Sequence, residues 1–329
     1  MDRGPRRMRI SLLVLLLALA GACSCVRPAA AGAIEVRAKP VVLDTSDPGR
    51  TRVGRLEWRG GVELTSSDPR FGGLSSLRVT PDGSRFVAIS DGGWRVDGSL
   101  QYDPEGLLAG VRSATLVPLL ARNGRPLPDI SREESDAESL VLEPDGSLIV
   151  GFEANHRIVS YPADGRKPSI VPAPPLLQDA PANAGLECLL RLKNGKLLAI
   201  TEGLAVDGGV RGWIGDGRAS GWQPVVWRTS GGFVPTDAAR LPSGDVLVLE
   251  RRFPPVGARL RRVSAESIVP GAVLDGLEIA RLEGALTVDN MEGIDAQRGP
   301  SGETLVWIIS DDNYSFLQRT LLLHFRLLD

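Results

Sequence analysis

Residues 186–203 read LECLLRLKNGKLLAITEG, and the fold class can be inferred from this segment. Two apolar runs flank Asn194-Gly195, and Asn-Gly is a strong signal for a tight β-hairpin turn because both residues tolerate a positive φ. The second run, residues 197–200, is apolar at four successive positions rather than at every second one. Strands that are covered on both faces show this pattern. The segment therefore predicts a hairpin packed between two neighbouring layers.

The same pattern occurs four more times along the chain. The turn pairs are Asp82-Gly83, Asp145-Gly146, Ser243-Gly244 and Ser301-Gly302, within residues 73–92, 137–154, 236–251 and 291–312. The turn glycines recur about every 50 to 60 residues, which suits one four-stranded propeller blade with loop insertions. Radially stacked blades are also covered on both faces. We therefore expect an all-β chain folded as a β-propeller, with a two-sheet sandwich as the alternative.

The number of blades is harder to predict from the sequence than the repeated hairpin. Five hairpins are detected, and the chain length favours six blades over five. Residues 56–64 form a further candidate strand region, but they lie too near the first hairpin to make a blade of their own. We expect them to close the ring together with residues 320–327.

Composition limits the classes of function. The 329 residues include 38 basic and 40 acidic side chains, a formal charge of −2, and 43% are apolar. This apolar fraction is enough for a core. Nucleic-acid binding is disfavoured because it requires a basic face that neutralises phosphates.

The N-terminus has the layout of a secretory signal peptide. Four arginines between Arg3 and Arg9 precede an apolar run over residues 10–20, and small residues follow up to Ala31. The run is too short to cross a bilayer, so we expect no transmembrane helix. The expected domains are a signal peptide, residues 1–31, and a propeller, residues 32–329, in a periplasmic or secreted and monomeric protein. A lipoprotein anchored through Cys23 is the minor alternative.

Cleavage after Ala31 would leave Cys188 as the single cysteine, so no internal disulfide is expected. Its apolar neighbours predict that Cys188 is a small buried hydrophobic residue rather than a nucleophile. The chain has no Gly-x-Ser-x-Gly motif and no zinc-type Cys/His spacing. Serine-hydrolase and zinc chemistry are therefore disfavoured.

Acidic residues recur at the ends of the hairpin strands. Counting back from each turn glycine leads to Ser75, Glu138, Glu187, Asp237 and Glu292. Counting forward leads to Asp91, Glu153, Glu202, Glu250 and Asp311. Because an antiparallel hairpin places the start of one strand beside the end of the next, both sets should lie at one end of the blades. We expect them to line the mouth of a central channel.

Carboxylates gathered in this way repel one another unless a cation lies among them. Ca²⁺ takes six to eight hard oxygen ligands, which suits this set. We hypothesise a calcium site drawn from Glu138, Glu187, Asp237 and Glu292. The alternative is that these are solvated carboxylates at strand ends.

Cationic side chains follow two of these acids. His156 and Arg157 come after Glu153, and Arg251 and Arg252 come directly after Glu250. A guanidinium grips phosphate or carboxylate with two parallel hydrogen bonds. These four residues are therefore candidates for holding a small anionic substrate, and ion pairs with the nearby acids are the alternative.

Several motifs together resemble the phytase-like family, described as "esterase-like activity of phytase", from about Gly60 to the C-terminus. The motifs are Phe71-Gly-Gly-Leu-Ser-Ser-Leu77, Pro81-Asp-Gly83, Ser90-Asp91, Asp136-Ala-Glu138, Val248-Leu-Glu-Arg251, Asp289-Asn-Met-Glu-Gly293 and Ser310-Asp-Asp-Asn-Tyr314 with Gln318 and Thr320. The resemblance implies an exported bacterial propeller that hydrolyses phosphoric esters. The acidic motif positions that it implies are Glu138, Glu187, Glu250, Glu292, Asp311 and Asp312, joined by Asn313.

These observations lead to one leading hypothesis of function and two alternatives. The leading hypothesis is calcium-dependent hydrolysis of a phosphomonoester or phosphodiester, with Glu292, Glu250 and Asp311 as candidate catalytic acids and Asp312 as a further metal ligand. A calcium-dependent lactonase, similar to gluconolactonase propellers, is the first alternative. A non-catalytic binding module stabilised by calcium is the second.

Overall fold

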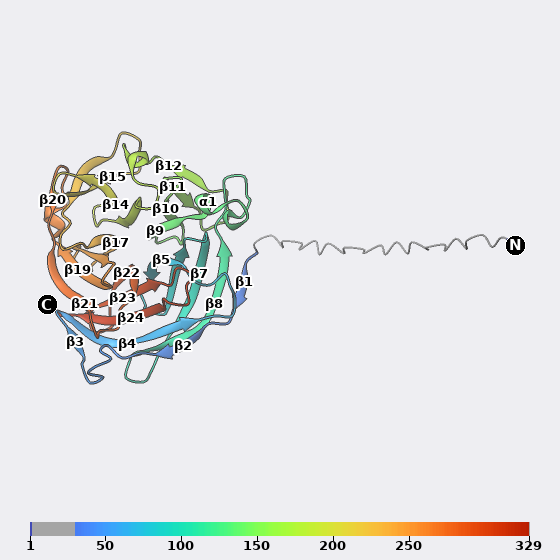
Figure 1. Cartoon of the computed structure of the whole chain (residues 1–329). Coiled ribbons are helices and arrows are strands. Elements are labelled where there is room, and N and C mark those ends of the chain that lie inside the picture. Colours follow the sequence, from blue (N-terminus) through green and yellow to red (C-terminus); the bar gives the residue numbers. More distant parts are fainter. Residues whose placement is uncertain (2–29, 329) are drawn as a thin grey trace.

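The computed structural model describes residue 1 and residues 30–328. Within this part of the chain, five units of four antiparallel strands stand as blades around a central axis (Figure 1), and one parallel pairing, between Gly60 and Leu108, joins the outermost strands of two blades. The innermost strands of blades 1 to 5 are β5 (Leu74–Val79), β9 (Ala137–Leu142), β13 (Leu186–Arg191), β17 (Val234–Arg240) and β22 (Asn290–Arg298). These five strands contact one another in that order, and β22 contacts β5 to complete the ring.

The remaining strands of each blade follow outward from the axis. The second strands are β6 (Arg85–Ser90), β10 (Leu148–Phe152), β14 (Leu197–Val206), β18 (Val246–Arg252) and β23 (Thr304–Asp311). The third strands are β7 (Trp94–Tyr102), β11 (Arg157–Tyr161), β15 (Gly209–Gly215), β19 (Gly257–Val263) and β24 (Thr320–Leu327). The outermost strands are β8 (Leu108–Pro118), β12 (Ser169–Val171), β16 (Gln223–Trp227), β21 (Leu277–Glu283) and β4 (Leu56–Thr65).

The propeller prediction is confirmed, but the preference for six blades is corrected to five among the described residues. Strand β4, from the N-terminal region, is the outermost strand of blade 5, where it pairs antiparallel with β24. The two ends of the chain therefore close the ring, as expected. The extra length that suggested a sixth blade lies in loops and in the short strands β1 (Gly32–Ile34), β2 (Arg37–Pro40), β3 (Arg52–Val53) and β20 (Val273–Leu274).

The five predicted hairpin turns are confirmed at their glycines. All five have a positive φ: Gly83 +70°, Gly146 +83°, Gly195 +80°, Gly244 +102° and Gly302 +88°. A residue with a Cβ is strained in this region, which explains why glycine occupies the same place in every repeat. These turns lie at the end of the channel opposite to the starts of the inner strands.

The core consists of five apolar clusters, each between two neighbouring blades. Leu197 contributes to the cluster between blades 2 and 3, while the next residue, Leu198, contributes to the cluster between blades 3 and 4. Because successive side chains of a strand point to opposite faces of the sheet, each blade contributes side chains to two apolar clusters. Cys188 is fully buried in one of them, as predicted.

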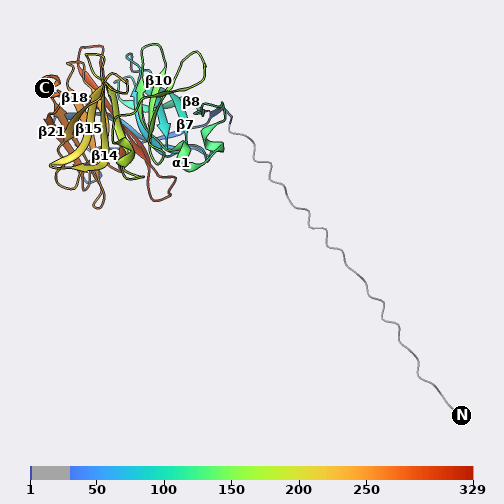
Figure 2. The ribbon, with the colours of Figure 1, turned by 90° about the horizontal axis from the view of Figure 1, so that it is seen from above.

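Within residues 30–328, helical structure is limited to short segments in the loops. They are α1 (Arg132–Ser135), which follows β8, and the 3₁₀ turns Leu127–Asp129, Leu177–Asp179 and Ala265–Ser267. Among the described residues, no helix combines the length and the apolarity needed to cross a membrane. Apart from residues 1, 30 and 31, the predicted signal peptide lies outside the described residues, as does Cys23. Figure 2 shows the ring from the side, with α1 at one face.

Candidate metal and active site at the channel mouth

Each inner strand carries a β-bulge near its start, at the same place in every blade. In blade 3, for example, Leu186 and Cys188 pair with successive residues of β14, which leaves Glu187 as the extra residue. A bulge turns one side chain away from the normal alternation and is frequent beside active sites. The bulged residues of the five blades are Ser75, Glu138, Glu187, Thr236 and Glu292.

The end of each second strand lies beside this bulge. The amide groups of Asp91, Glu153 and Glu202 donate to the carbonyl groups of Gly73, Asp136 and Gly185, each within 3.0 Å. In blades 4 and 5, Arg251 pairs with Val234 and Asp311 pairs with Asn290. The structure therefore brings the two predicted sets to the same end of the channel.

In blade 4, the pairing of β17 with β18 shows that the predicted positions are wrong by one residue in both strands. The bulged position is Thr236 rather than Asp237, and the position at the end of the second strand is Arg251 rather than Glu250. Thr236 and Arg251 stand at the same distances from the turn glycine Gly244 as the acids of blades 2 and 3 from theirs; neither is acidic, and the prediction selected the acids beside them. Asp237 and Glu250 therefore do not occupy the positions equivalent to the acids of the other blades.

Both displaced acids are buried in other ion pairs. Asp237 is 0% exposed and pairs with Arg78, with 2.8 Å between Oδ2 and Nη1. Glu250, also 0% exposed, accepts hydrogen bonds from Trp227 Nε1 at 3.0 Å and from the guanidinium groups of Arg259 and Arg261. With these partners, neither carboxylate is available to a metal ion or a substrate at the mouth.

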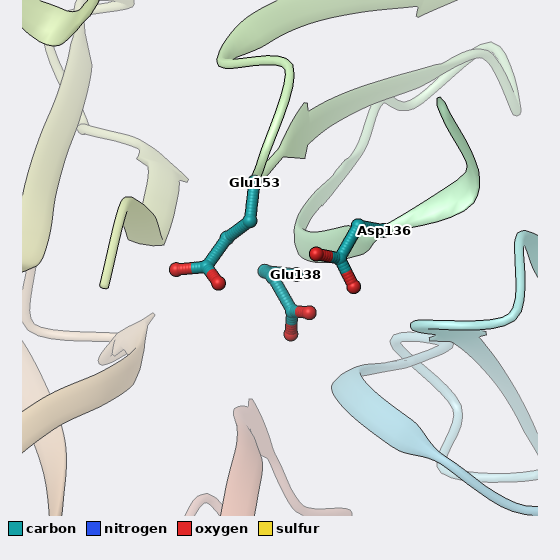
Figure 3. Close-up of side chains that lie close together, drawn as sticks. All are labelled: Asp136, Glu138 and Glu153. Carbon is teal, nitrogen blue, oxygen red and sulfur yellow. The ribbon is translucent and has the colours of Figure 1, made fainter. Parts of the chain in front are cut away.

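Three carboxylates form the tightest part of the acidic cluster. Asp136, Glu138 and Glu153 each offer an oxygen atom within 4.8 Å of the others. Figure 3 shows their side chains close together; Glu138 belongs to β9, Asp136 directly precedes this strand and Glu153 directly follows β10. Burial and the charge of Asp91 raise the pKa of Asp136 to about 6 although Arg132 opposes the effect, and burial raises the pKa of Glu153 to about 7. For Glu138, burial, Glu153 and Asp136 together raise the pKa well above its ordinary value.

The other mouth acids extend this cluster around the ring. Burial, together with the charges of Glu153 and Glu138, raises the pKa of Glu187 well above its ordinary value. Burial raises the pKa of Glu292 to about 8 and that of Asp311 to about 7. Asp91 is also raised in pKa by its burial. The protein therefore holds these carboxylates in an environment that disfavours their negative charge.

Two arginines offset part of this charge. Arg251 lies 2.7 Å from Glu202 and 3.2 Å from Glu292, and these acids raise its pKa even though burial opposes the effect. Arg132, from α1, lies 2.8 Å from Asp91. The contact with Glu292 is made by Arg251 Nε, whereas Asp91 Oδ1 is a buried atom at the mouth without a hydrogen-bond partner.

Asp312 shapes the wall of the mouth. Its Oδ1 atom accepts hydrogen bonds from the amide groups of Gly73 and Tyr314, both at 3.0 Å, and Oδ2 accepts one from Thr320 at 2.9 Å. Asn313 adopts a positive φ of 48° beside it and donates to Gln318. Asp312 therefore fixes the loop that carries these residues against blade 1.

Three of the four predicted substrate-binding cations have protein partners away from the cluster. His156 is buried, with its Nε2 atom 3.1 Å from the carbonyl oxygen of Ala180. Arg157 lies over the ring of Phe152 and pairs with Glu134 at 3.4 Å. Arg252 pairs with Glu283 at 2.8 Å. Only Arg251 lies among the mouth acids.

The structure also adds residues that the strand-end count missed. Asp136 belongs to the tightest triad, and Arg132 pairs with Asp91. The signal for Asp136 was its place two residues before Glu138, in the turn that leads into β9. Arg132 had no such signal because α1 brings it to the mouth from outside the repeat.

Comparison with solved structures gives several similar chains. One is a candidate gluconolactonase, with 15% identity, a TM-score of 0.44, and 89% of this chain and 94% of the other covered. Another is a luciferin-regenerating enzyme, with 15% identity, a TM-score of 0.42, and 87% and 95% covered. A protein of unknown function from Bacteroides thetaiotaomicron has 12% identity, a TM-score of 0.46, and 89% and 76% covered.

Comparison with curated protein sequences finds no match. A family model described as "Phytase-like: Esterase-like activity of phytase" matches residues 69–314, from the loop before β5 to the loop that follows β23. This segment contains every bulged residue and every mouth acid described above. The chain therefore belongs to the phytase-like family.

Proposed function

We propose that this protein is a cation-dependent hydrolase of phosphoric esters, with its site at the acidic mouth of the channel. The observation that carries the proposal is the triad of Asp136, Glu138 and Glu153, whose oxygen atoms lie within 4.8 Å of one another. The description of the family, esterase-like activity of phytase, supports the reaction class.

The donor set fits a hard divalent cation. The triad offers only carboxylate oxygens, and Glu187, Glu292 and Asp91 lie close enough to change the pKa of Glu138 or its neighbours. Two arginines, Arg132 and Arg251, are too few to balance these acids. Calcium is our choice because it accepts many oxygen ligands in flexible geometry. Asp136, Glu138 and Glu153 would hold it, and Asp91 Oδ1, which has no hydrogen-bond partner, is available to join them.

A cation bound there would neutralise phosphate oxygens and lower the pKa of a bound water. The chain's own residues supply the other requirements. Each terminal nitrogen of Arg251 carries two N–H groups, and one on each is used by Asn290 and Glu202, so the others can donate to a phosphate oxygen and orient the ester. Glu292 and Asp311, with pKa values of about 8 and about 7, are the candidates for proton transfer to the leaving group, because such values lie near neutral pH. Glu250 is left out of this role, since Trp227, Arg259 and Arg261 occupy its carboxylate.

One observation favours a lactonase as the second candidate. His156, Arg157 and Arg252 have partners elsewhere, and Arg251 is already paired with two acids. The mouth is therefore poorer in free positive charge than a site for a multiply charged ester would be. A lactone is neutral and needs no such charge, while the same cation could polarise its carbonyl group.

The test is turnover by the protein after treatment with an immobilised chelator, with and without added Ca²⁺. The substrates are a chromogenic phosphomonoester, a chromogenic phosphodiester, phytate and a sugar lactone. We expect calcium-dependent hydrolysis of a phosphoric ester that is lost in Glu138→Gln and retained in Glu278→Gln, a matched change in an acid paired with Arg281 on the outer strand β21. Undiminished phosphoesterase activity without divalent cation would reject the metal step. Lactone turnover alone would establish the second candidate, and calcium binding without any turnover would indicate a binding module.

The place of action follows from the N-terminal segment. We propose that the protein works in the periplasm or outside the cell, because a basic head and a short apolar run precede Ala31. Expression of the full chain, followed by fractionation and N-terminal sequencing, tests this. An uncut chain in the cytoplasm would contradict it, and a lipid on Cys23 would establish the anchored alternative.

A further inference from the structure

The channel end that carries the hairpin turns is hollow and basic. A cavity of about 810 Å³ opens there, and its wall includes residues from all five blades. Seven basic side chains line this turn-face cavity: Arg78, Arg85, Arg95, Arg191, Lys193, Arg240 and Arg298. Three acidic side chains share the wall: Asp97, Glu143 and Asp295.

The three acids already have partners within the protein. Asp97 pairs with Arg95 at 2.6 Å, and Glu143 pairs with Arg191. Asp295 accepts hydrogen bonds from the amide of Val79 at 2.7 Å and from the side chain of Gln297 at 2.9 Å. Asp97 and Glu143 therefore neutralise Arg95 and Arg191, while the hydrogen bonds of Asp295 are to neutral donors, and the wall keeps more basic than acidic side chains.

Four cations of the wall lack a carboxylate partner. Within residues 30–328, Arg85, Lys193 and Arg240 make no side-chain ion pair or hydrogen bond, and Arg298 makes only a long contact, 3.4 Å, with the carbonyl oxygen of Gly302. These residues belong to the hairpins of blades 1, 3, 4 and 5, so they surround the opening. Like charges held around one cavity repel one another unless anions lie between them.

We propose that the turn-face cavity binds a small polyanion, a molecule that carries two or more phosphate or carboxylate groups. Its volume lies within the range of small-molecule sites, roughly 300 to 1,000 Å³. Cations on separate blades can each meet a different anionic group of one ligand, and guanidinium groups match phosphate and carboxylate geometry. A single monovalent anion would satisfy only one of them.

This site is separate from the acidic mouth. The buried pair of Arg78 and Asp237 lies between the two ends of the channel, and Arg78 also bonds to the carbonyl oxygens of Leu189 and Ile294. A ligand at the turn face therefore does not reach the mouth acids. The inference does not depend on the activity proposed for the mouth.

The test is calorimetric titration with pyrophosphate, and separately with citrate, after an immobilised chelator has removed divalent cations. Under these conditions the mouth acids repel both probes. We expect one saturable site whose affinity falls as salt is added. Arg240→Ala and Arg85→Ala should each weaken binding about tenfold or more, since each removes a charge-assisted hydrogen bond. Arg112→Ala is the matched control, because Arg112 is an exposed arginine on the outer strand β8 that also has no ion pair among the described residues.

Three results would overturn the proposal. One is no saturable binding of either probe, and another is equal weakening by Arg112→Ala and Arg240→Ala. The third is binding that survives both cavity variants but is lost in Arg251→Ala, which would place the anion at the mouth. Circular dichroism and melting temperature identify a variant that has not folded, and Arg240→Gln then replaces Arg240→Ala because it keeps most of the side-chain volume.

Discussion

Arg78 and Asp237 form a two-pronged ion pair inside the channel, with 2.8 Å between Nη1 and Oδ2 and 3.0 Å between Nη2 and Oδ1. Arg78 also donates to the carbonyl oxygens of Leu189 and Ile294, at 3.1 and 3.0 Å. Strands β5, β17, β13 and β22 are therefore connected through one side chain. Apolar packing holds neighbouring blades together, whereas this pair links four of the five blades at the axis.

Asp237→Asn should destabilise the fold strongly. The change leaves the buried guanidinium of Arg78 without its counter-charge, and breaking a buried pair in this way costs about 3 to 5 kcal/mol. Urea denaturation measures the loss. Asp164→Asn is the matched control, since Asp164 pairs with Arg166 at the surface and such a pair is worth about 1 kcal/mol or less. Equal losses in the two variants would contradict the role of the axial pair.

Cation binding should depend on the triad and not on the acids of the outer strands. Glu138→Gln and Glu153→Gln each remove a charged oxygen from the group of three within 4.8 Å, and we expect about tenfold weaker calcium binding in each. Glu278→Gln should bind calcium as the unchanged protein does. Calorimetric titration of calcium measures all three. Unchanged calcium affinity in both triad variants would show that the cation binds elsewhere.

Much of the fold was predictable because it rests on local chemistry. The Asn194-Gly195 turn and the unbroken apolar run after it encode a hairpin with two buried faces, and Leu197 and Leu198 do enter different clusters. The blade number was not predictable in this way. The pairing of residues 56–64 with residues 320–327 was expected, but the chain length also favoured a sixth blade, and length alone does not distinguish a blade from long loops and the short strands β1, β2, β3 and β20.

The site was predictable as a set of acids, but not in its exact membership. Glu138, Glu187 and Glu292 were identified because an acid occupies the bulged position in their blades. In blade 4 the equivalent positions hold Thr236 and Arg251, which are not acidic, so the prediction wrongly selected the neighbouring acids Asp237 and Glu250. The partners that remove Arg252 and His156 from the mouth, Glu283 and the carbonyl of Ala180, lie on other strands and loops, so only the tertiary structure reveals them.

Without a divalent cation, the protein should lose stability as the pH rises. The pKa values of Glu292, Glu153 and Asp311 are raised to about 8, about 7 and about 7. Between the ordinary carboxylate pKa and these values, the folded state binds more protons than the unfolded state, so the free energy of unfolding falls with increasing pH. From pH 5 to pH 8 the free energy of unfolding should fall by an amount on the order of a few kcal/mol. The melting temperature, which measures this loss, should therefore decrease over the same range.

Calcium should reverse this trend. Carboxylate ligands bind the metal in their ionised form, so the stabilisation by calcium should be larger at pH 8 than at pH 5, and binding should release protons. Glu292→Gln should flatten part of the decline because glutamine does not titrate. In the cation-free protein, a melting temperature that is constant or rises from pH 5 to pH 8 would contradict this prediction. It would show that the mouth acids ionise in the folded state without a bound cation.

Arg251→Ala should separate the two candidate reactions. Removing this cation from between Glu202 and Glu292 increases the negative charge of the mouth, so calcium should bind more tightly. Hydrolysis of a phosphoric ester should nevertheless fall about tenfold or more, because the donor that orients the phosphate is gone. Hydrolysis of a neutral lactone, which needs no such donor, should keep its rate. Tighter calcium binding with undiminished phosphoesterase activity would show that Arg251 does not bind the substrate. Unchanged calcium affinity would show that the calcium ion binds too far from Arg251 to be affected by its charge.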